Sequence, residues 1–220
     1  MCGRFTVLTK EELADVVESS RQRRAPASLL RGRDGEEPLQ PRLQARPGSE
    51  VDAVANLNGD VVTQQLMWGF SVPWNSRPVI NTRLESALGG TKMWSGPLRE
   101  GRCILPAASF FEPRNVDEPD DPEAKRATRQ SYEFMQPDGL PLLIAGVQDA
   151  GRVSIVTTQP NADVAPIHQR MPLVLAFEEA PIWLQGEIAD LASLADRSSI
   201  PLTGILERPR RTGPEQLSLF

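Results

Sequence analysis

Cys2 is the residue whose chemistry depends most on its position, because it follows the initiating methionine in Met1-Cys2-Gly3-Arg4-Phe5. Methionine aminopeptidase removes Met1 when the next side chain is small, so Cys2 is expected to carry a free α-amine and a thiol. The amine titrates near ~8 and the thiol near ~8.5, so each has a reactive fraction at neutral pH. An aldehyde would form a Schiff base with the amine, and the thiol would then close a thiazolidine ring. Taken alone, however, Cys2 is better explained as an inert, buried residue near the terminus, because most cysteines in cytosolic proteins are of this kind.

Three further polar residues are candidates for a role in a site: two follow apolar stretches, and one is the only residue of its type in the chain. Asn81 comes directly after Val79-Ile80, Glu112 comes directly after Phe110-Phe111, and His168 is the only histidine. Desolvation at an apolar strand end raises the pKa of a glutamate and suits it for proton transfer near neutral pH. A histidine with a pKa near ~6.5 is a natural general acid or base. Taken singly, Asn81 also fits a turn or cap, Glu112 a rim carboxylate, and His168 a hydrogen-bonded core residue.

The elements that must position these residues are mostly strands. Two β-prone runs, 50–57 and 61–68, flank Asn58-Gly59, the strongest short signal for a hairpin. Thr9 followed by Glu12 is a capping-box pattern that predicts a helix over about 10–20. Further strands are predicted at 102–112, 132–136, 140–148, 152–158 and 171–176, and Pro137-Asp138-Gly139 is predicted to turn a hairpin. Helices are predicted near 177–186 and 187–196, and a long loop is predicted over 21–49. The fold class expected is α+β: a single β-rich domain with mainly antiparallel sheets in a barrel-like core, flanked by a few helices.

The composition is that of a globular protein and argues for the cytoplasm. No apolar run approaches the ~18 residues of a membrane span, and the N-terminus lacks the apolar core of a signal peptide. Two cysteines, Cys2 and Cys103, indicate a reducing compartment, and with one histidine they make a zinc site improbable. The net charge of −5 argues mildly against a protein that coats nucleic acid, although seven arginines within 21–46 leave room for a basic patch.

Five segments carry a resemblance when they are taken together in chain order. They are Met1-Cys2-Gly3-Arg4-Phe5, Trp68-Gly69-Phe70, Asn81-Thr82-Arg83-Leu84-Glu85, Ser109-Phe110-Phe111-Glu112 and Ile167-His168-Gln169-Arg170-Met171-Pro172. This set resembles the SRAP family, the SOS-response-associated peptidase-like proteins that crosslink to abasic sites in single-stranded DNA. The resemblance spans roughly residues 2–200, and its N-terminal and His-x-Arg-Met-Pro segments are the specific ones.

The resemblance implies four catalytic residues and no metal or cofactor. Cys2 would attack the ring-opened deoxyribose aldehyde and form the thiazolidine, while Glu112 would shuttle protons between amine, thiol and sugar. Asn81 would hold the Cys2 backbone or the sugar by hydrogen bonding. His168 would protonate the sugar ring oxygen or hydroxyl, which promotes opening to the aldehyde and, in reverse, release of the adduct.

The resemblance also implies a DNA-binding surface. Arg4 and Arg83 match positions that grip phosphates beside the lesion. Trp68 and Phe70 match an apolar region where bases stack or are wedged apart. The expected partner is single-stranded DNA that contains abasic sites, and a monomer is expected.

The C-terminal segment carries a second resemblance. The chain becomes polar and basic from Glu207 and ends in Gln216-Leu217-Ser218-Leu219-Phe220. This pentapeptide resembles the motif with which bacterial DNA-replication proteins dock onto the β sliding clamp: Leu217, Leu219 and Phe220 would fill an apolar pocket and Gln216 would form hydrogen bonds. We therefore expect an SRAP-like domain over 1–206, a flexible clamp-binding tail over 207–220, and localisation with the nucleoid at replication forks. A strand or helix end that packs back onto the core is the alternative.

Two other functions remain open from the sequence. The first is a cysteine peptidase or autopeptidase in which Cys2 and His168 form the dyad. The second is a noncatalytic module that binds modified or single-stranded DNA. Covalent adduct formation at Cys2 separates both from the crosslinking hypothesis.

Overall fold

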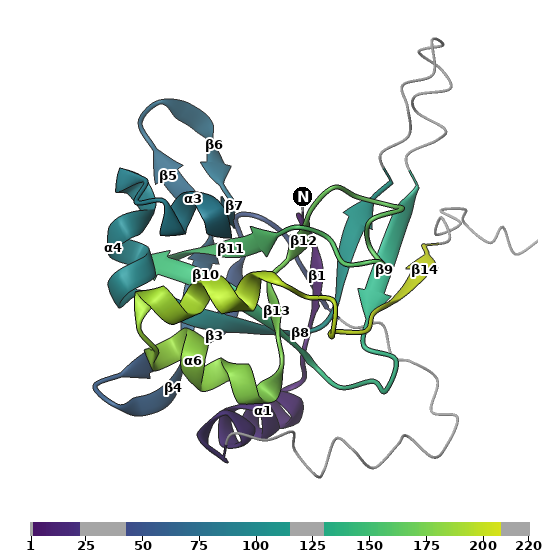
Figure 1. Ribbon diagram of the computed structural model, residues 1–220, viewed down its shortest axis with the longest axis horizontal. Helices are drawn as coiled ribbons and strands as arrows, with labels where there is room; N and C mark the ends of the chain where they lie inside the picture. Colours follow the sequence, from purple (N-terminus) through teal and green to yellow (C-terminus); the bar gives the residue numbers. More distant parts are fainter. Residues whose placement is uncertain (1, 23–42, 115–129, 208–220) are drawn as a thin grey trace, which may run out of the picture.

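The computed structural model describes residues 2–22, 43–114 and 130–207, which form a β-rich domain with short helices (Figure 1). The strands are β1 (Phe5–Val7), β2 (Gln44–Ala45), β3 (Glu50–Leu57), β4 (Asp60–Trp68), β5 (Phe70–Val72), β6 (Asn75–Val79), β7 (Asn81–Arg83), β8 (Arg102–Pro113), β9 (Ser131–Met135), β10 (Leu142–Asp149), β11 (Arg152–Thr158), β12 (Met171–Pro172), β13 (Val174–Leu175) and β14 (Thr203–Leu206). The helices are α1 (Lys10–Gln22), α3 (Leu84–Leu88), α4 (Lys92–Glu100) and α6 (Ala180–Gln185), with 3₁₀ segments η1 (Phe177–Glu179) and η2 (Ile188–Ala195).

Five strands close on themselves and form the barrel-like core that the sequence predicts. β8 pairs with β10, β10 with β11, β11 with β4, β4 with β3, and β3 again with β8. Among the pairings of the described strands, only β11 with β4 and β11 with β7 are parallel. The predicted α+β class with mainly antiparallel strands is therefore confirmed.

Two local predictions are confirmed in atomic detail. At the start of α1 the Glu12 amide donates to the Thr9 hydroxyl over 3.2 Å, and the Thr9 amide donates to the Glu12 carboxylate over 2.9 Å, which is a complete capping box. Between β3 and β4, Asn58 and Gly59 both adopt positive φ, of 54° and 95°. Left-handed backbone at both turn residues matches the twist of the strands, so β3 and β4 pair along their whole length.

The turn at Pro137-Asp138-Gly139 is present but does not make the predicted hairpin. The Gly139 amide donates to the Gln136 carbonyl over 3.1 Å, yet β9 and β10 pair with successive parts of β8. The 12-residue β8 is long enough to accept the two strands one after the other along the same edge. The sequence signal identified a turn correctly, but the length of β8 decided the pairing.

Other differences concern short elements. The strand predicted at 171–176 is divided into β12 and β13, which pair with β11 and β10. The helix predicted over 187–196 is the 3₁₀ segment η2. The sequence analysis missed the β5–β6 hairpin, the helices α3 and α4, and the edge strand β14. Most of the predicted loop over 21–49 lies outside the described residues.

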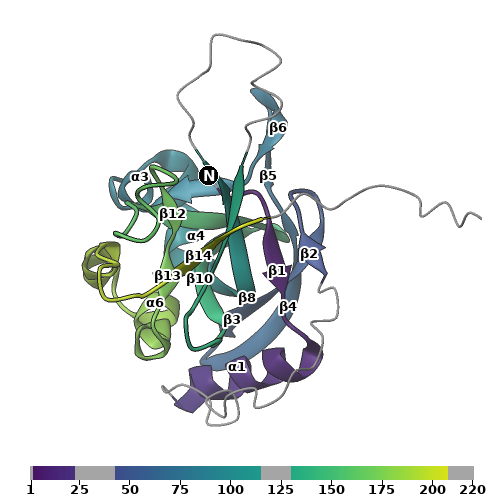
Figure 2. The same cartoon turned by 90° about the vertical axis from the view of Figure 1, so that its right-hand side faces the viewer.

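The core consists of two apolar layers. One buried cluster joins barrel residues such as Leu105 and Ile155 to Cys2, Phe5 and Phe134, which come from β9 and from the segment that contains β1. Between the barrel and the helices lie Trp183, whose indole donates to the Cys103 carbonyl over 2.8 Å, and Trp94. Figures 1 and 2 show α1 at one end of the barrel and the N-terminus at the other, on the same side as the β5–β6 hairpin. Within the described residues, no helix has the length and apolar character needed to cross a membrane.

Candidate active site

The pairing of β1 with β8 carries Cys2 to the end of β8, where Glu112 lies. Phe5 faces Phe110 in this antiparallel pair, and the Phe111 amide donates to the Arg4 carbonyl over 3.0 Å. Both Cys2 and Glu112 are fully buried. The two side chains are close enough for the Glu112 charge to act on the thiol. Residues 110 positions apart are thus brought together by one strand pair.

Strand β11 delivers the other two residues. It pairs with β7 along one edge, where Asn81 faces Ile155, and with β12 along the other, where Met171 faces Thr158. The Asn81 side-chain amide donates to the Cys2 carbonyl over 3.0 Å. His168 precedes β12, and its Nε2 lies 3.8 Å from a carboxylate oxygen of Glu112. The structure therefore brings together Cys2, Asn81, Glu112 and His168 in one cluster, in which Asn81 is half-buried and the other three are buried.

Burial dominates the electrostatics of this cluster. Desolvation raises the pKa of Glu112 to about 7, so the carboxyl can both give and take a proton near neutral pH. Desolvation, together with the charge of Glu112, raises the pKa of the Cys2 thiol to about 12. Burial lowers the pKa of His168, while a hydrogen bond to the Arg170 backbone acts in the opposite direction. At neutral pH the site therefore holds a neutral thiol beside a glutamate that is poised to exchange a proton.

Asn81 also presents an unused acceptor. Its side-chain oxygen is buried and has no hydrogen-bond partner in the part of the chain that the structure describes. Leaving a buried carbonyl oxygen unpaired costs free energy, so such an atom is suited to accept a hydrogen bond from a ligand.

The two arginines expected to hold phosphates differ in their surroundings. Arg83 is exposed on β7. Arg4 forms a bidentate ion pair with Glu207, donates to the Ser131 hydroxyl over 3.0 Å, and lies over the Phe111 ring at 3.8 Å from its centroid. A phosphate that binds Arg4 therefore has to compete with the Glu207 carboxylate.

The two aromatic residues assigned to base stacking are core residues, which corrects that part of the sequence analysis. Trp68 is 0% exposed, packs against Phe5, and donates its indole hydrogen to the Ile80 carbonyl over 3.1 Å. Phe70 is buried and meets the edge of Trp94. A ring with no free face cannot stack on a base, because its surface is already occupied by the protein.

An aromatic residue that the sequence analysis missed is Trp74, between β5 and β6. Its side chain is 72% exposed, and Arg77 next to it on β6 is exposed as well. Such an exposure is unusual for tryptophan, which is mostly buried in folded proteins. The sequence Pro73-Trp74-Asn75, with turn-forming residues on both sides of the ring, was the available signal.

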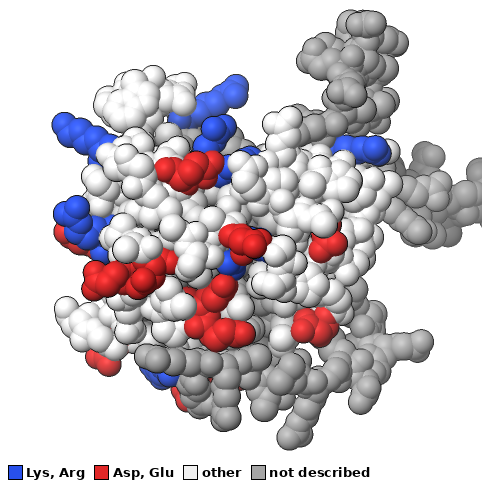
Figure 3. Space-filling model, in the orientation of Figure 1, with Lys and Arg blue, Asp and Glu red and all other residues white. Residues whose placement is uncertain are grey.

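The surface charge is uneven around this site. Figure 3 shows basic side chains mostly along the upper and left margins of this face, and acidic side chains mostly across its middle. Among the described residues, no group of three or more histidine, cysteine, aspartate or glutamate side chains is arranged to hold a metal ion. The residues of the clamp-binding motif, Gln216 to Phe220, lie outside the described residues.

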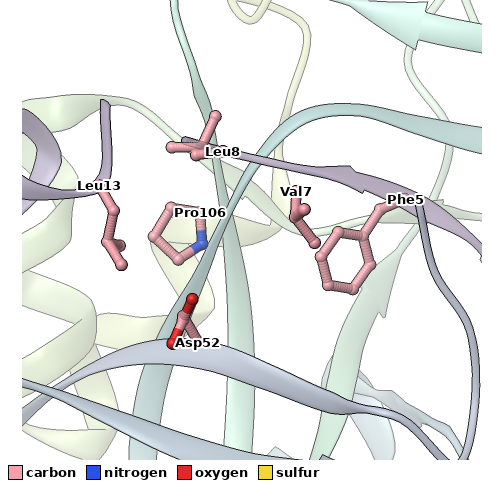
Figure 4. A pocket seen from close by; sticks show the side chains of 6 residues that line it. All are labelled: Phe5, Val7, Leu8, Leu13, Asp52 and Pro106. Carbon is pink, nitrogen blue, oxygen red and sulfur yellow. The ribbon is translucent and has the colours of Figure 1, made fainter. Parts of the chain in front are cut away.

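A small pocket lies elsewhere along β1. It is lined by Phe5, Val7, Leu8, Leu13, Asp52 and Pro106 (Figure 4). Its lining is apolar apart from one carboxylate and contains none of the four clustered residues. The pocket therefore supplies no chemistry to the site.

The fold and the site together define the class of protein: a β-rich domain with a barrel-like core, in which the side chains of Cys2, Asn81, Glu112 and His168 form one cluster. The model of one family, SOS response associated peptidase (SRAP), matches residues 1–203, and the chain belongs to this family.

Curated relatives extend over nearly the whole chain. The abasic site processing protein YoqW of Bacillus subtilis (strain 168) is 28% identical over 242 aligned positions, which cover 98% of each protein. The abasic site processing protein YedK of Escherichia coli (strain K12) is 25% identical and covers 91% of this chain and 88% of its own. Among solved structures, a phage-related protein of Bordetella bronchiseptica matches with a TM-score of 0.68 at 22% identity, covering 94% of both chains, which shows a shared fold.

Proposed function

We propose that this protein processes abasic sites in single-stranded DNA by forming a covalent thiazolidine between Cys2 and the ring-opened sugar. The observation that carries the proposal is the buried cluster, in which Asn81 holds the Cys2 backbone at 3.0 Å and Glu112 lies beside the thiol and His168. The names of the relatives YoqW and YedK support the same substrate. The proposal requires that Met1 is removed, so that Cys2 has a free α-amine.

The chemistry starts at the amine because the thiol is neutral. The α-amine adds to the sugar aldehyde, and protonated Glu112 gives its proton to the departing hydroxyl, so that water leaves and an iminium forms. The Cys2 thiol then passes its proton to the Glu112 carboxylate, and the sulfur adds to the iminium carbon to close the ring. One water is released overall, and Glu112 returns to its starting state. A pKa of about 7 suits both transfers.

Asn81 and His168 have supporting roles in this proposal. Asn81 fixes the Cys2 carbonyl through its amide group, and its unpaired side-chain oxygen accepts a hydrogen bond from the sugar or from the α-amine. His168 exchanges a proton with the sugar ring oxygen, so that the closed hemiacetal opens to the reactive aldehyde. The same exchange in reverse allows the adduct to dissociate.

DNA is held outside this cluster by basic and aromatic side chains. Arg83 and Arg4 bind phosphates beside the lesion, Arg4 after displacing Glu207. Trp74, with Arg77, offers an exposed ring on which a base can stack. Trp68 and Phe70 support this surface from the core. We further propose that the protein acts as a monomer in the cytoplasm and that Gln216, Leu217, Leu219 and Phe220 tether it to the sliding clamp at replication forks.

The peptidase alternative receives less support. A cysteine nucleophile of a peptidase is activated by a lowered pKa, whereas burial raises the pKa of Cys2 to about 12. The His168 ring faces Glu112, and its Nε2 lies 3.8 Å from a carboxylate oxygen of that residue. A neutral thiol suits the second step of aldehyde capture, in which an iminium has already made the carbon electrophilic.

Intact-mass measurement tests the proposal. After incubation with an abasic single-stranded oligonucleotide, the protein without Met1 should gain the mass of the oligonucleotide minus one water. Cys2→Ala should form no heat-stable adduct, whereas the control Cys103→Ala, which removes the other buried thiol, should form it. A heat-stable adduct with Cys2→Ala, or none with the wild type, would refute thiazolidine formation.

A further inference from the structure

His168 Nδ1 has two partners that belong to the same residue. The Arg170 amide lies 3.1 Å from Nδ1, and the Arg170 carbonyl oxygen lies 2.9 Å from it. A neutral ring with its proton on Nε2 accepts from the amide, whereas a ring protonated at Nδ1 donates to the carbonyl. The Arg170 backbone therefore offers a partner to Nδ1 in each protonation state, without movement of the ring.

The Arg170 side chain is itself held tightly. Its guanidinium forms a bidentate ion pair with Glu85, with the second bond at 3.0 Å, and it donates to the Thr157 carbonyl over 2.7 Å. Arg170 is buried, while the Glu85 side chain on α3 is 54% exposed. The hydrogen bond from Arg170 lowers the pKa of Glu85, so the carboxylate stays charged at neutral pH. A planar, bidentate pair fixes orientation as well as distance.

We propose that Glu85 is a positioning residue for His168 and acts through Arg170. Without the Glu85 carboxylate, the buried guanidinium of Arg170 loses half of its bonded partners and is drawn toward water, together with the backbone that flanks Nδ1. The imidazole then loses the fixed Arg170 partners of Nδ1 and its fixed direction toward Glu112. The inference rests on the proposed role of His168 in proton transfer, but its structural part can be tested without DNA.

The charges around the ring allow positioning to be distinguished from a simple field effect. Glu112 faces His168 from β8, and the charge of the N-terminal α-amine lowers the pKa of His168. Arg170 follows His168 in the chain, and Glu85 lies behind Arg170 on α3. Removing the charge of Glu85 alone lowers the pKa of His168 by electrostatics. Arg170→Lys keeps the charge but removes the bidentate fork, so a field effect leaves the pKa unchanged.

The experiment uses the fact that His168 is the only histidine, so its ring gives a single set of NMR signals. Ring ¹⁵N and ¹³C-bound proton shifts of the full chain are followed from pH 5 to 8 in the wild type, Glu85→Gln, Arg170→Lys and a control, Glu100→Gln, which removes an exposed carboxylate from α4. We expect both Glu85→Gln and Arg170→Lys to lower the His168 pKa, because the protonated ring loses its hydrogen bond to the Arg170 carbonyl, and we expect no change in Glu100→Gln. A shift in Glu85→Gln alone, or no shift in either variant, would overturn the inference.

Adduct formation is the second readout. Glu85→Gln should slow crosslinking about 10-fold, which is a part of the 10²–10⁴-fold that a positioned general acid or base contributes. The pH profile of the crosslinking rate should shift in the same direction as the His168 pKa. If the wild type crosslinks and Glu85→Gln crosslinks at the same rate with the same pH profile, the inference is also overturned. If the wild type forms no adduct, the proposed function fails, and the NMR titration still decides whether Glu85 positions His168.

Discussion

Replacing Glu112 by glutamine should stabilise the fold while it impairs the proposed reaction. Burial raises the pKa of Glu112 from 4.5 to about 7, so between these values the folded protein holds a proton that the unfolded chain has released. The favourable contribution of protonated Glu112 is therefore complete below pH 4.5, falls as the pH rises, and is lost above about pH 7. Glutamine does not ionise and has no such loss.

The expected magnitude follows from the size of the pKa displacement. At about 1.4 kcal/mol per pH unit, raising the pKa from 4.5 to about 7 corresponds to about 3 kcal/mol in the free energy of unfolding. Glu112→Gln should gain up to this amount relative to the wild type between pH 4.5 and 8. At about 2–4 °C per kcal/mol in a protein of this length, the gain should be plain in the melting temperature.

Urea denaturation at a series of pH values measures this difference. Tryptophan fluorescence is a suitable signal, because Trp68 and Trp183 are fully buried. Glu50→Gln, which changes an exposed carboxylate on β3, is the matched control and should show no pH-dependent gain. In the crosslinking assay at pH 7, Glu112→Gln should be slower than the wild type.

A stability difference between Glu112→Gln and the wild type that stays constant from pH 5 to 8 would refute the reasoning. It would mean that the Glu112 carboxyl ionises in the folded protein as it does in water. The assignment of Glu112 as the proton carrier of the site would then lose its physical basis.

Three further predictions concern DNA, the tail and the core. Trp74→Ala should weaken binding of single-stranded DNA by about 1–3 kcal/mol without changing the melting temperature, whereas Trp68→Ala should destabilise the fold by about 3–5 kcal/mol. Fluorescence anisotropy measures DNA binding and thermal denaturation measures stability. A Trp68→Ala variant that melts at the same temperature as the wild type would contradict the assignment of Trp68 to the core. Glu207→Gln should tighten DNA binding several-fold at low salt because it releases Arg4, and the gain should vanish in an Arg4→Gln background; a gain that persists there would show a general charge effect instead. Deletion of 216–220 should abolish binding to the sliding clamp in surface plasmon resonance and leave crosslinking in vitro intact; unchanged clamp affinity would exclude the proposed motif.

Local elements were predictable from the sequence where a few neighbouring residues decide the backbone. The capping box at Thr9 and Glu12 and the turn at Asn58-Gly59 need only side chains and φ angles within four residues of each other. The turn at 137–139 was predicted in the same way, but its strands pair with β8 and not with each other. Pairing is decided by the whole sheet, so the sequence signal could not give it.

The site shows the same division between sequence and tertiary structure. The five sequence segments that resemble the SRAP family, taken in chain order, singled out Cys2, Asn81, Glu112 and His168, although each of these residues taken singly also fits an ordinary structural role. Only the fold decided which side chains have free surface: it buried Trp68, exposed Trp74, and paired Arg4 with Glu207. Burial depends on which strands meet, as when β1 and β11 carry Cys2, Asn81 and His168 to the end of β8. The raised pKa of Glu112 is a consequence of that burial, and it suits a glutamate at a strand end to the proton transfers proposed at neutral pH.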